Sequence, residues 1–175
     1  MLSHIHSAEF KAVVDVEIKA LLLKGTFKYA SILETDDTPL PVMWLFTYKF
    51  DEDRYLLKHK ARIVARGDLQ TLEEETYATT LAAQTFCAVM ALAAGFDLET
   101  RQYDAVNAFA NTRLPIPIYC QSAEGYERQG KLWRVLMVLY GLRKSLLLWY
   151  KDFTLSLADL GLEAIPNTNC LFVND

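Results

Sequence analysis

The stretch 43–65, MWLFTYKFDEDRYLLKHKARIVA, decides the fold class of this protein. Both of its halves are dense in aromatic and β-branched residues, and they flank the polar segment Asp51–Arg54. This pattern predicts a β-hairpin. In its second strand Lys58, Lys60 and Arg62 alternate with other residues, so all three side chains share one face of the hairpin.

The rest of the chain mixes helical and extended patterns. Apolar periodicity predicts helices over roughly 8–24 (before Gly25), over Leu81–Ala94 as a buried helix, and over Ser145–Leu160. Extended patterns predict strands at Thr26–Leu33, Leu98–Asp104, Ile118–Gln121 (after Pro115 and Pro117), Leu132–Leu139 and Cys170–Val173. Because no regular βαβ rhythm appears, we expect an α+β fold with a mixed, mostly antiparallel sheet and packed helices.

Composition indicates one globular domain. The chain has 175 residues, of which 52% are hydrophobic. Its longest apolar run, Phe86–Phe96, is far shorter than the roughly 20 residues that a membrane span needs, and the N-terminal residues do not resemble a secretory signal. The three cysteines (Cys87, Cys120 and Cys170) are widely separated. We therefore expect buried, reduced thiols and an intracellular protein, cytoplasmic or nuclear, without a membrane anchor.

The charges are segregated along the chain. The net charge is −4, which argues mildly against a nucleic-acid-binding protein. Two stretches, Arg54–Gly67 and Arg128–Lys151, nevertheless contain lysines and arginines and no acidic residue. They could form a local basic surface for RNA or DNA, or they could be ordinary solvated faces.

General catalytic motifs are absent from the sequence. It contains no nucleophile elbow, no P-loop and no HExxH pair. His4 and His6 form an HxH pair without a third ligand nearby, which disfavours a metal site. We expect His59 to lie at the surface, and Gly67 to mark a turn rather than a phosphate cradle.

Local motifs resemble those of one polymerase family. The segment 58–70 (KHKARIVARGDLQ) is similar to the finger strand of Ty1/copia-type reverse transcriptases, and 102–109 (QYDAVNAF) to their first palm motif. The segment 139–142 (LYGL), followed by Trp149–Tyr150, resembles the next motif, and 44–53 and 75–78 also fit in order. The resemblance covers about residues 9–175. It implies a right-hand polymerase fold and RNA-templated DNA synthesis with Mg²⁺, deoxynucleoside triphosphates and an RNA or DNA template-primer.

The resemblance also assigns roles to individual residues. By this resemblance Asp104, with Ala105 beside it, matches the first metal-binding carboxylate of the family. Such carboxylates hold two ions, which clamp the attacking and leaving oxygens during nucleotidyl transfer. The alternative is that Asp104 only caps the following turn. Phe109 matches the bulky ring that excludes a ribose 2′-hydroxyl, although it could equally be a core aromatic residue.

Basic and glycine residues complete the expected site. Lys60 and Arg62 would bind the incoming triphosphate, unless they are only gatekeeping charges of an edge strand. Tyr140 would pack on the nascent base pair, and Gly141 would allow close backbone approach to it or form a bend before the last helix. Further contacts with nucleic acid are expected at Lys58, Arg66, Arg143 and Lys144.

Several positions depart from the family pattern. The chain stops at Asp175, short of the Tyr-x-Asp-Asp turn that carries the other metal ligands of the family. Cys87, Leu146, Met43 and Arg54 replace residues typical of the family, and Arg54 would occupy a turn position that suits glycine. We therefore expect a single partial domain over 1–175: an N-terminal helix and fingers at about 9–97, and an incomplete palm at about 98–175.

These departures lead to an expectation about activity. The chain is interpreted as a fragment of a retrotransposon polyprotein that is inactive by itself. Two alternatives are a non-catalytic nucleic-acid-binding module and an inert transposon remnant.

Overall fold

The computed structural model describes residues 6–71, 75–168 and 170–174. His4, Glu73 and Glu74 lie outside the described residues. The helices are α1 (Ser7–Leu23), α2 (Ala83–Gly95) and α3 (Ser145–Asp159), with 3₁₀ turns η1 (Ile32–Glu34), η2 (Gly67–Leu69) and η3 (Ala108–Asn111). The strands are β1 (Phe27–Ser31), β2 (Val42–Phe50), β3 (Leu56–Ala65), β4 (Arg113–Cys120), β5 (Lys131–Met137), β6 (Glu163–Ala164) and β7 (Phe172–Val173). The predicted α+β class is confirmed.

The body of the molecule is a three-stranded antiparallel sheet in the order β1-β5-β4. Its central strand β5 carries Trp133 and Val135, whose side chains are completely buried. Trp133 stacks on Phe27 of β1 with ring centres 4.0 Å apart. The predicted apolar strand Leu132–Leu139 therefore forms the core, because it has a partner strand on each side.

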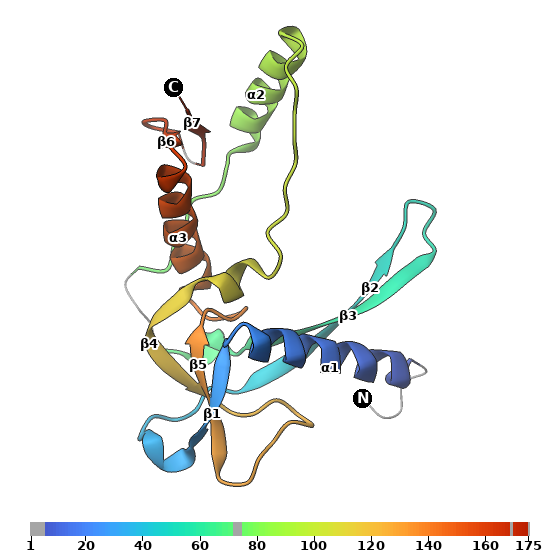
Figure 1. Ribbon diagram of the computed structural model, residues 1–175, viewed down its shortest axis with the longest axis vertical. Coiled ribbons are helices and arrows are strands. Elements are labelled where there is room, and N and C mark those ends of the chain that lie inside the picture. The colour runs from blue at the N-terminus through green and yellow to red at the C-terminus, as the bar shows by residue number, and fades with distance from the viewer. Residues whose placement is uncertain (1–5, 72–74, 169, 175) are drawn as a thin grey trace.

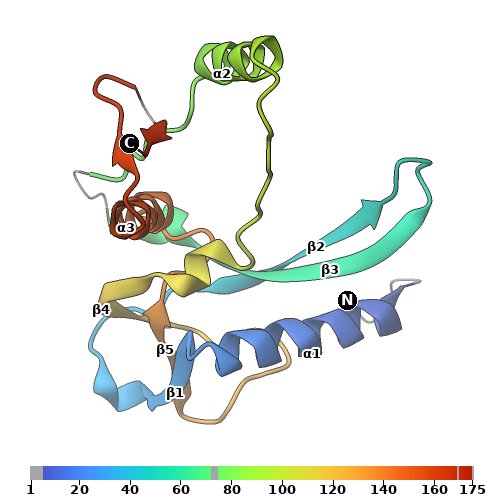
Figure 2. The same ribbon diagram turned by 45° about the horizontal axis from the view of Figure 1, so that its top comes forward.

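The hairpin of β2 and β3 projects from this body as a long arm, and α1 lies beside it (Figures 1 and 2). Its antiparallel register runs from Val42 opposite Ala65 to Lys49 opposite Lys58. Arg54 adopts a positive φ of 67° in the connecting turn, which is the strained position expected from the sequence. The buried face of α1 repeats at helical spacing and consists of Phe10, Val14, Ile18 and Leu21.

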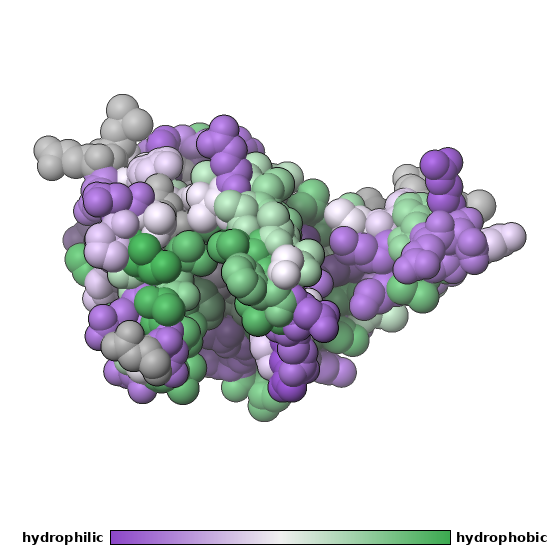
Figure 3. Space-filling model, turned by 90° about the horizontal axis from the view of Figure 1, so that it is seen from above, coloured by the Kyte–Doolittle hydropathy of each residue, from purple (hydrophilic) through white to green (hydrophobic). Residues whose placement is uncertain are grey.

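The helix α2 differs from its expected environment. Its bounds agree with the prediction to within two residues, but the helix is exposed. Ala93 is its one buried residue, and Phe86 and Leu92 are 54% and 57% exposed. It stands away from the body on long irregular connections (Figure 1). Seen from the α2 end, hydrophobic surface crosses the middle of the molecule, whereas hydrophilic side chains crowd the end of the arm (Figure 3). Cys87, on α2, is exposed, so the expectation of buried cysteines is confirmed only for Cys120.

Two strand predictions also need correction. Residues 98–104 form no strand, because no described strand pairs with them, and without a sheet edge their alternation has nothing to pack against. The strand around Ile118 begins earlier than expected, at Arg113, and includes Pro115 and Pro117. The pairing of β4 with β5 is interrupted between Arg113 and Ile118, so the missing proline N–H groups cost no ladder hydrogen bonds there.

Candidate functional site

The arm carries four cations on one face. Residues directly opposite each other in an antiparallel pair share a face, and Lys49 lies opposite Lys58 while Thr47 lies opposite Lys60. Lys49, Lys58, Lys60 and Arg62 thus form one surface, here called the basic face. Like charges placed directly opposite each other destabilise a sheet, so this arrangement favours an anionic ligand. Sequence analysis missed Lys49, although the position of the hairpin turn was sufficient to pair it with Lys58.

The other face of the arm packs on α1. The ring of His59 lies 4.9 Å from Phe10 and 5.3 Å from Tyr48, measured between ring centres. His59 is therefore half-buried, and the expectation that it lies at the surface was wrong. The alternation in β3 thus separates an aromatic face that contacts α1 from the basic face.

Local electrostatics distinguish Lys60 from an ordinary surface lysine. Desolvation, followed by repulsion from Arg62, lowers the pKa of Lys60, while the carboxylate of Glu17 on α1 opposes this effect. Burial raises the pKa of Glu17, and Lys60 and Arg62 counteract the increase. A cation that is already crowded by other cations gains more from a bound anion than an isolated one does.

Arg62, Tyr140 and Phe109 meet at the base of the arm. The guanidinium carbon of Arg62 lies 5.3 Å from the centre of the Tyr140 ring, within cation–π range. Tyr140 in turn meets Phe109 edge to face, with ring centres 4.8 Å apart. The fold thus brings together three residues, predicted from separate motifs, that come from β3, from η3 and from the turn before α3.

Phe109 also supports the body of the protein. Trp149 of α3 meets its ring edge to face at 6.3 Å, and Phe109 packs against the main hydrophobic core. Both interpretations made from the sequence, a core aromatic and a ring facing the substrate, are compatible with this half-buried position.

Gly141 forms a bend against the end of β3. It has a φ of +88°, and a Cβ built on it would lie 2.2 Å from the carbonyl oxygen of Ala65. Of the two interpretations of this glycine, the bend is the one that the structure shows. Its close approach is to the protein's own backbone.

Asp104 lies in an irregular, exposed segment rather than at the end of a strand. The chain just after it is held in place: Asn107 adopts a left-handed conformation, and the Asn111 amide donates a hydrogen bond of 3.3 Å to the Val106 carbonyl. Lys24, after α1, contacts the side chain of Asn111 as well. These contacts hold the backbone of residues 106–111, just after Asp104, against the body of the protein.

The next question is which metal ligands the structure places around Asp104. Among the described residues, no group of three or more His, Cys, Asp or Glu side chains is placed to hold a metal. Mg²⁺ usually keeps several waters and takes one or two carboxylates together with substrate phosphates. Asp104 offers a single exposed carboxylate, which by itself does not fit a pair of ions.

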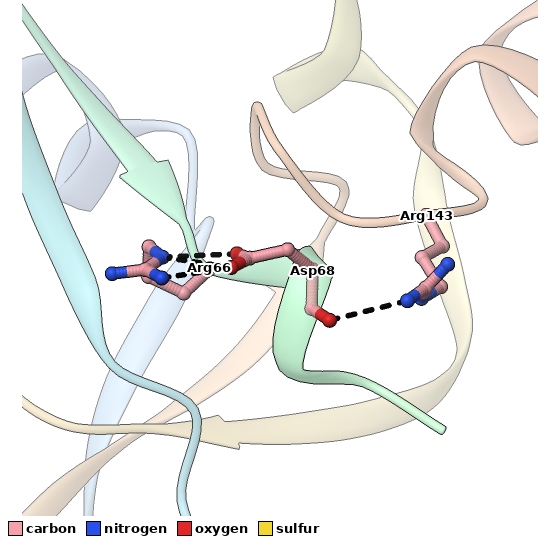
Figure 4. A network of polar contacts seen from close by, with 3 residues as sticks. All are labelled: Arg66, Asp68 and Arg143. Atoms are coloured by element: carbon pink, nitrogen blue, oxygen red, sulfur yellow. Dashed lines mark hydrogen bonds and ion pairs between the residues drawn. The ribbon is translucent and has the colours of Figure 1, made fainter. Parts of the chain in front are cut away.

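Two of the predicted nucleic-acid contacts bind the protein itself (Figure 4). Arg66 donates two parallel hydrogen bonds to the carboxylate of Asp68, at 2.9 and 2.7 Å. This interaction holds the pKa of Asp68 below its usual value. Arg143 donates to the backbone carbonyls of Asp68 and Gln70, at 3.1 and 3.2 Å.

Lys144 directly precedes α3 and lines a cavity of about 300 Å³ between that helix and β4. The other walls of this cavity are mainly apolar and include Leu114, Ile118, Leu142 and Leu148. Lys144 therefore lies beside the body, whereas Lys58 lies out on the arm.

Comparison with known proteins identifies the family. The model of a family described as reverse transcriptase (RNA-dependent DNA polymerase) matches residues 25–175. The chain belongs to this reverse transcriptase family. The match includes the arm, the segment with Asp104 and the turn with Tyr140, so the resemblance noted from the motifs is confirmed.

Curated relatives place this reverse transcriptase segment among the copia-type elements. It is 31% identical over 159 residues to the retrovirus-related Pol polyprotein from transposon TNT 1-94 of Nicotiana tabacum, an alignment covering 87% of this chain and 12% of the relative. It is 29% identical over 136 residues to the corresponding polyprotein from transposon RE2 of Arabidopsis thaliana, covering 74% of this chain and 9% of the relative. The truncated transposon Ty1-A Gag-Pol polyprotein of Saccharomyces cerevisiae is 28% identical over 168 residues, covering 90% of this chain and 14% of that protein.

The chain thus corresponds to a small part of each of these polyproteins and represents a copia-type reverse transcriptase segment of a retrotransposon Pol polyprotein. No solved structure matches it. In the part of the chain that the structure describes, no helix has the length and apolar character needed to cross a membrane.

Proposed function

We propose that this reverse transcriptase segment binds the incoming deoxynucleoside triphosphate and the template-primer. The contact of Arg62 with Tyr140, and of Tyr140 with Phe109, is the observation that carries the proposal. Arg62 offers a cation for phosphate, and the adjoining Tyr140 offers an aromatic ring that could meet a sugar or a base. The two side chains are in contact at the end of the basic face. Charge-assisted bonds from Lys60 and Arg62 would hold the triphosphate.

The remaining predicted residues take the roles of support and of backbone contact. Phe109, held by Trp149, would present a ring that clashes with a ribose 2′-hydroxyl. Lys58 and Lys144 would contact the phosphates of the template-primer. Arg66 pairs with Asp68 through Nε and one Nη in the free protein, so its other Nη would be the donor left for such a contact.

In the same proposal the chain is part of a right-hand polymerase. The fingers comprise about residues 9–97 and an incomplete palm comprises about 98–175. The arm of β2 and β3, with α1 beside it (Figure 1), supports the assignment of fingers. Arg62 of its basic face contacts Tyr140, in the turn before α3.

We further propose that these residues alone bind nucleotide without polymerising it. When bound, Mg²⁺ would neutralise charge on the triphosphate, and Asp104 is the residue of this chain that would hold it. Nucleotidyl transfer requires two ions that bracket the transferred phosphoryl group, and one exposed carboxylate does not hold such a pair.

Primer extension tests both proposals. The assay compares the 175-residue chain with the same chain fused to the following reverse transcriptase segment of an intact copia-type relative. We expect no extension by the chain alone and measurable extension by the fusion. Extension by the chain alone would overturn the proposal that it does not polymerise. A fusion that folds but extends no primer would argue that these residues no longer form a working site.

A matched pair of variants tests Asp104 within the fusion. Asp104→Asn keeps the side-chain volume and removes the charge, so extension should disappear. Asp97→Asn makes the same change seven residues earlier, at a residue with a positive φ that asparagine tolerates, and should retain extension. Equal activity of the two variants would contradict a metal-binding role for Asp104.

The second candidate function is binding of nucleic acid without any role in synthesis, and the basic face is the observation that favours it. It predicts that the isolated chain binds RNA while the fusion remains inactive. An inert remnant would bind no RNA, and its fusion would be inactive as well.

A further inference from the structure

The end of β3 contacts the turn before α3 through backbone atoms. We call this contact, between Ala65–Gln70 and Tyr140–Arg143, the joint. The Ala65 N–H donates a hydrogen bond of 2.8 Å to the carbonyl oxygen of Tyr140. A Cβ built on Gly67 would lie 2.0 Å from the carbonyl oxygen of Gly141, so the two glycines meet with no room for a side chain.

Arg143 closes the joint from the other side. Its backbone N–H donates to Oε1 of Gln70 at 3.0 Å, and its guanidinium donates to the carbonyl of Gln70. The guanidinium also donates to the carbonyl of Asp68 (Figure 4). The planar fork of arginine reaches two carbonyls at once, which a lysine ammonium cannot do in the same geometry. Two of the five guanidinium N–H donors of Arg143 are thus directed at the protein's own backbone.

We propose that Arg143 is a positioning residue that fixes the basic face of the arm relative to Tyr140, and that it is not a contact with nucleic acid. The inference rests on the proposed binding function. Arg62 lies three residues before Ala65 in β3, and Tyr140 lies three residues before Arg143, so the joint sets the distance between Arg62 and the Tyr140 ring. The arm and the aromatic pair then form a preorganised surface, which saves ordering cost when a ligand binds.

Binding of a single-stranded 20-nucleotide RNA across a salt series separates positioning from phosphate contact. A positioning role predicts that Arg143→Lys and Arg143→Gln weaken binding equally, by about three- to tenfold, because both lose the carbonyl bonds. Their salt dependence should match that of the wild-type chain. A phosphate contact instead predicts near-normal binding by Arg143→Lys, and a slope of log K against log salt reduced by about 0.7 in Arg143→Gln. That second result would overturn the proposal.

Two comparison variants calibrate these measurements. Lys144→Gln removes one charge from the neighbouring residue and should reduce the salt slope if Lys144 contacts phosphate. Lys28→Gln removes one charge from β1, outside the proposed site, and should leave affinity and slope unchanged.

Amide hydrogen exchange tests the joint without any ligand. In both Arg143 variants the Ala65 amide should exchange faster, while the amide of Val135 in the central strand keeps its protection and reports that the body is folded. Unchanged protection of the Ala65 amide in Arg143→Gln would overturn the proposal that Arg143 holds the joint, even if the chain binds RNA. Accelerated exchange at Ala65 in a chain whose wild type does not bind RNA would confirm the joint and refute only the binding function.

Discussion

Replacing Lys60 and Arg62 by alanine should remove about half of the salt dependence that the basic face contributes to RNA binding. The basic face carries four cations on the arm, and each phosphate neutralised on a single strand contributes about −0.7 to the slope of log K against log salt. Four contacts from the basic face therefore contribute about −2.8 to the slope, and two contribute about −1.4. Between 50 and 200 mM salt, this contribution alone lowers affinity about 50-fold in the wild-type chain and about sevenfold in the double variant.

The measurement is fluorescence anisotropy with a labelled single-stranded 20-nucleotide RNA at five or more salt concentrations. The control variant replaces Lys28 and Lys131 by alanine, which removes two positive charges from exposed positions on β1 and β5. It should retain the wild-type slope, because these residues lie on the three-stranded sheet and not on the arm. The reasoning is refuted if both double variants change the slope equally, since net charge rather than the basic face would then control binding.

Three further predictions concern other parts of the chain. Iodoacetamide should label Cys87 in the native protein and Cys120 only after unfolding. Cys87 is exposed, whereas burial raises the pKa of Cys120 to about 12. Labelling of both cysteines in the native protein, detected by mass spectrometry, would contradict this prediction. The pKa of Lys60 lies below the ordinary 10.5, so Lys60 loses its charge at a lower pH than an ordinary lysine does. As the pH is raised, RNA affinity should therefore begin to fall before pH 10.5 is reached, and Lys60→Ala should show a smaller fall in the same titration. The apolar surface of α2 should cause concentration-dependent association in sedimentation experiments, which Phe86→Asp with Leu92→Asp should reduce; a monomeric wild-type chain at high concentration would refute this.

Patterns within a few residues were sufficient to predict much of the architecture. The alternation in 43–65 predicted the arm and its basic face, because side chains in a strand point to opposite sides with a period of two. The spacing of Phe10, Val14 and Ile18 predicted α1, since an apolar stripe needs only the helical period. Five motifs in the right order and spacing, the one around Tyr140 among them, were sufficient to recognise the family, because that recognition depends on residue order.

The positions that the sequence left open depend on contacts between distant segments. Residues 98–104 have the alternation of a strand, but a strand forms only where another strand offers hydrogen bonds, and no described strand does so. Helix α2 is apolar enough to be buried, yet the fold leaves it exposed because almost nothing packs against it. The two prolines of β4 are tolerated because its pairing is interrupted where they lie.

The candidate site shows the same division. The resemblance of the motifs to those of reverse transcriptases singled out Arg62, Phe109, Tyr140 and Arg143 in the sequence. Only the tertiary structure decided that Arg62 touches Tyr140 and that Tyr140 touches Phe109, and that two guanidinium donors of Arg143 point to the carbonyls of Asp68 and Gln70. The physical reason is that local periodicity follows from backbone geometry over a few residues. The partner of a side chain depends instead on which distant segments fold against it, and here those are brought together by the joint between β3 and the turn before α3.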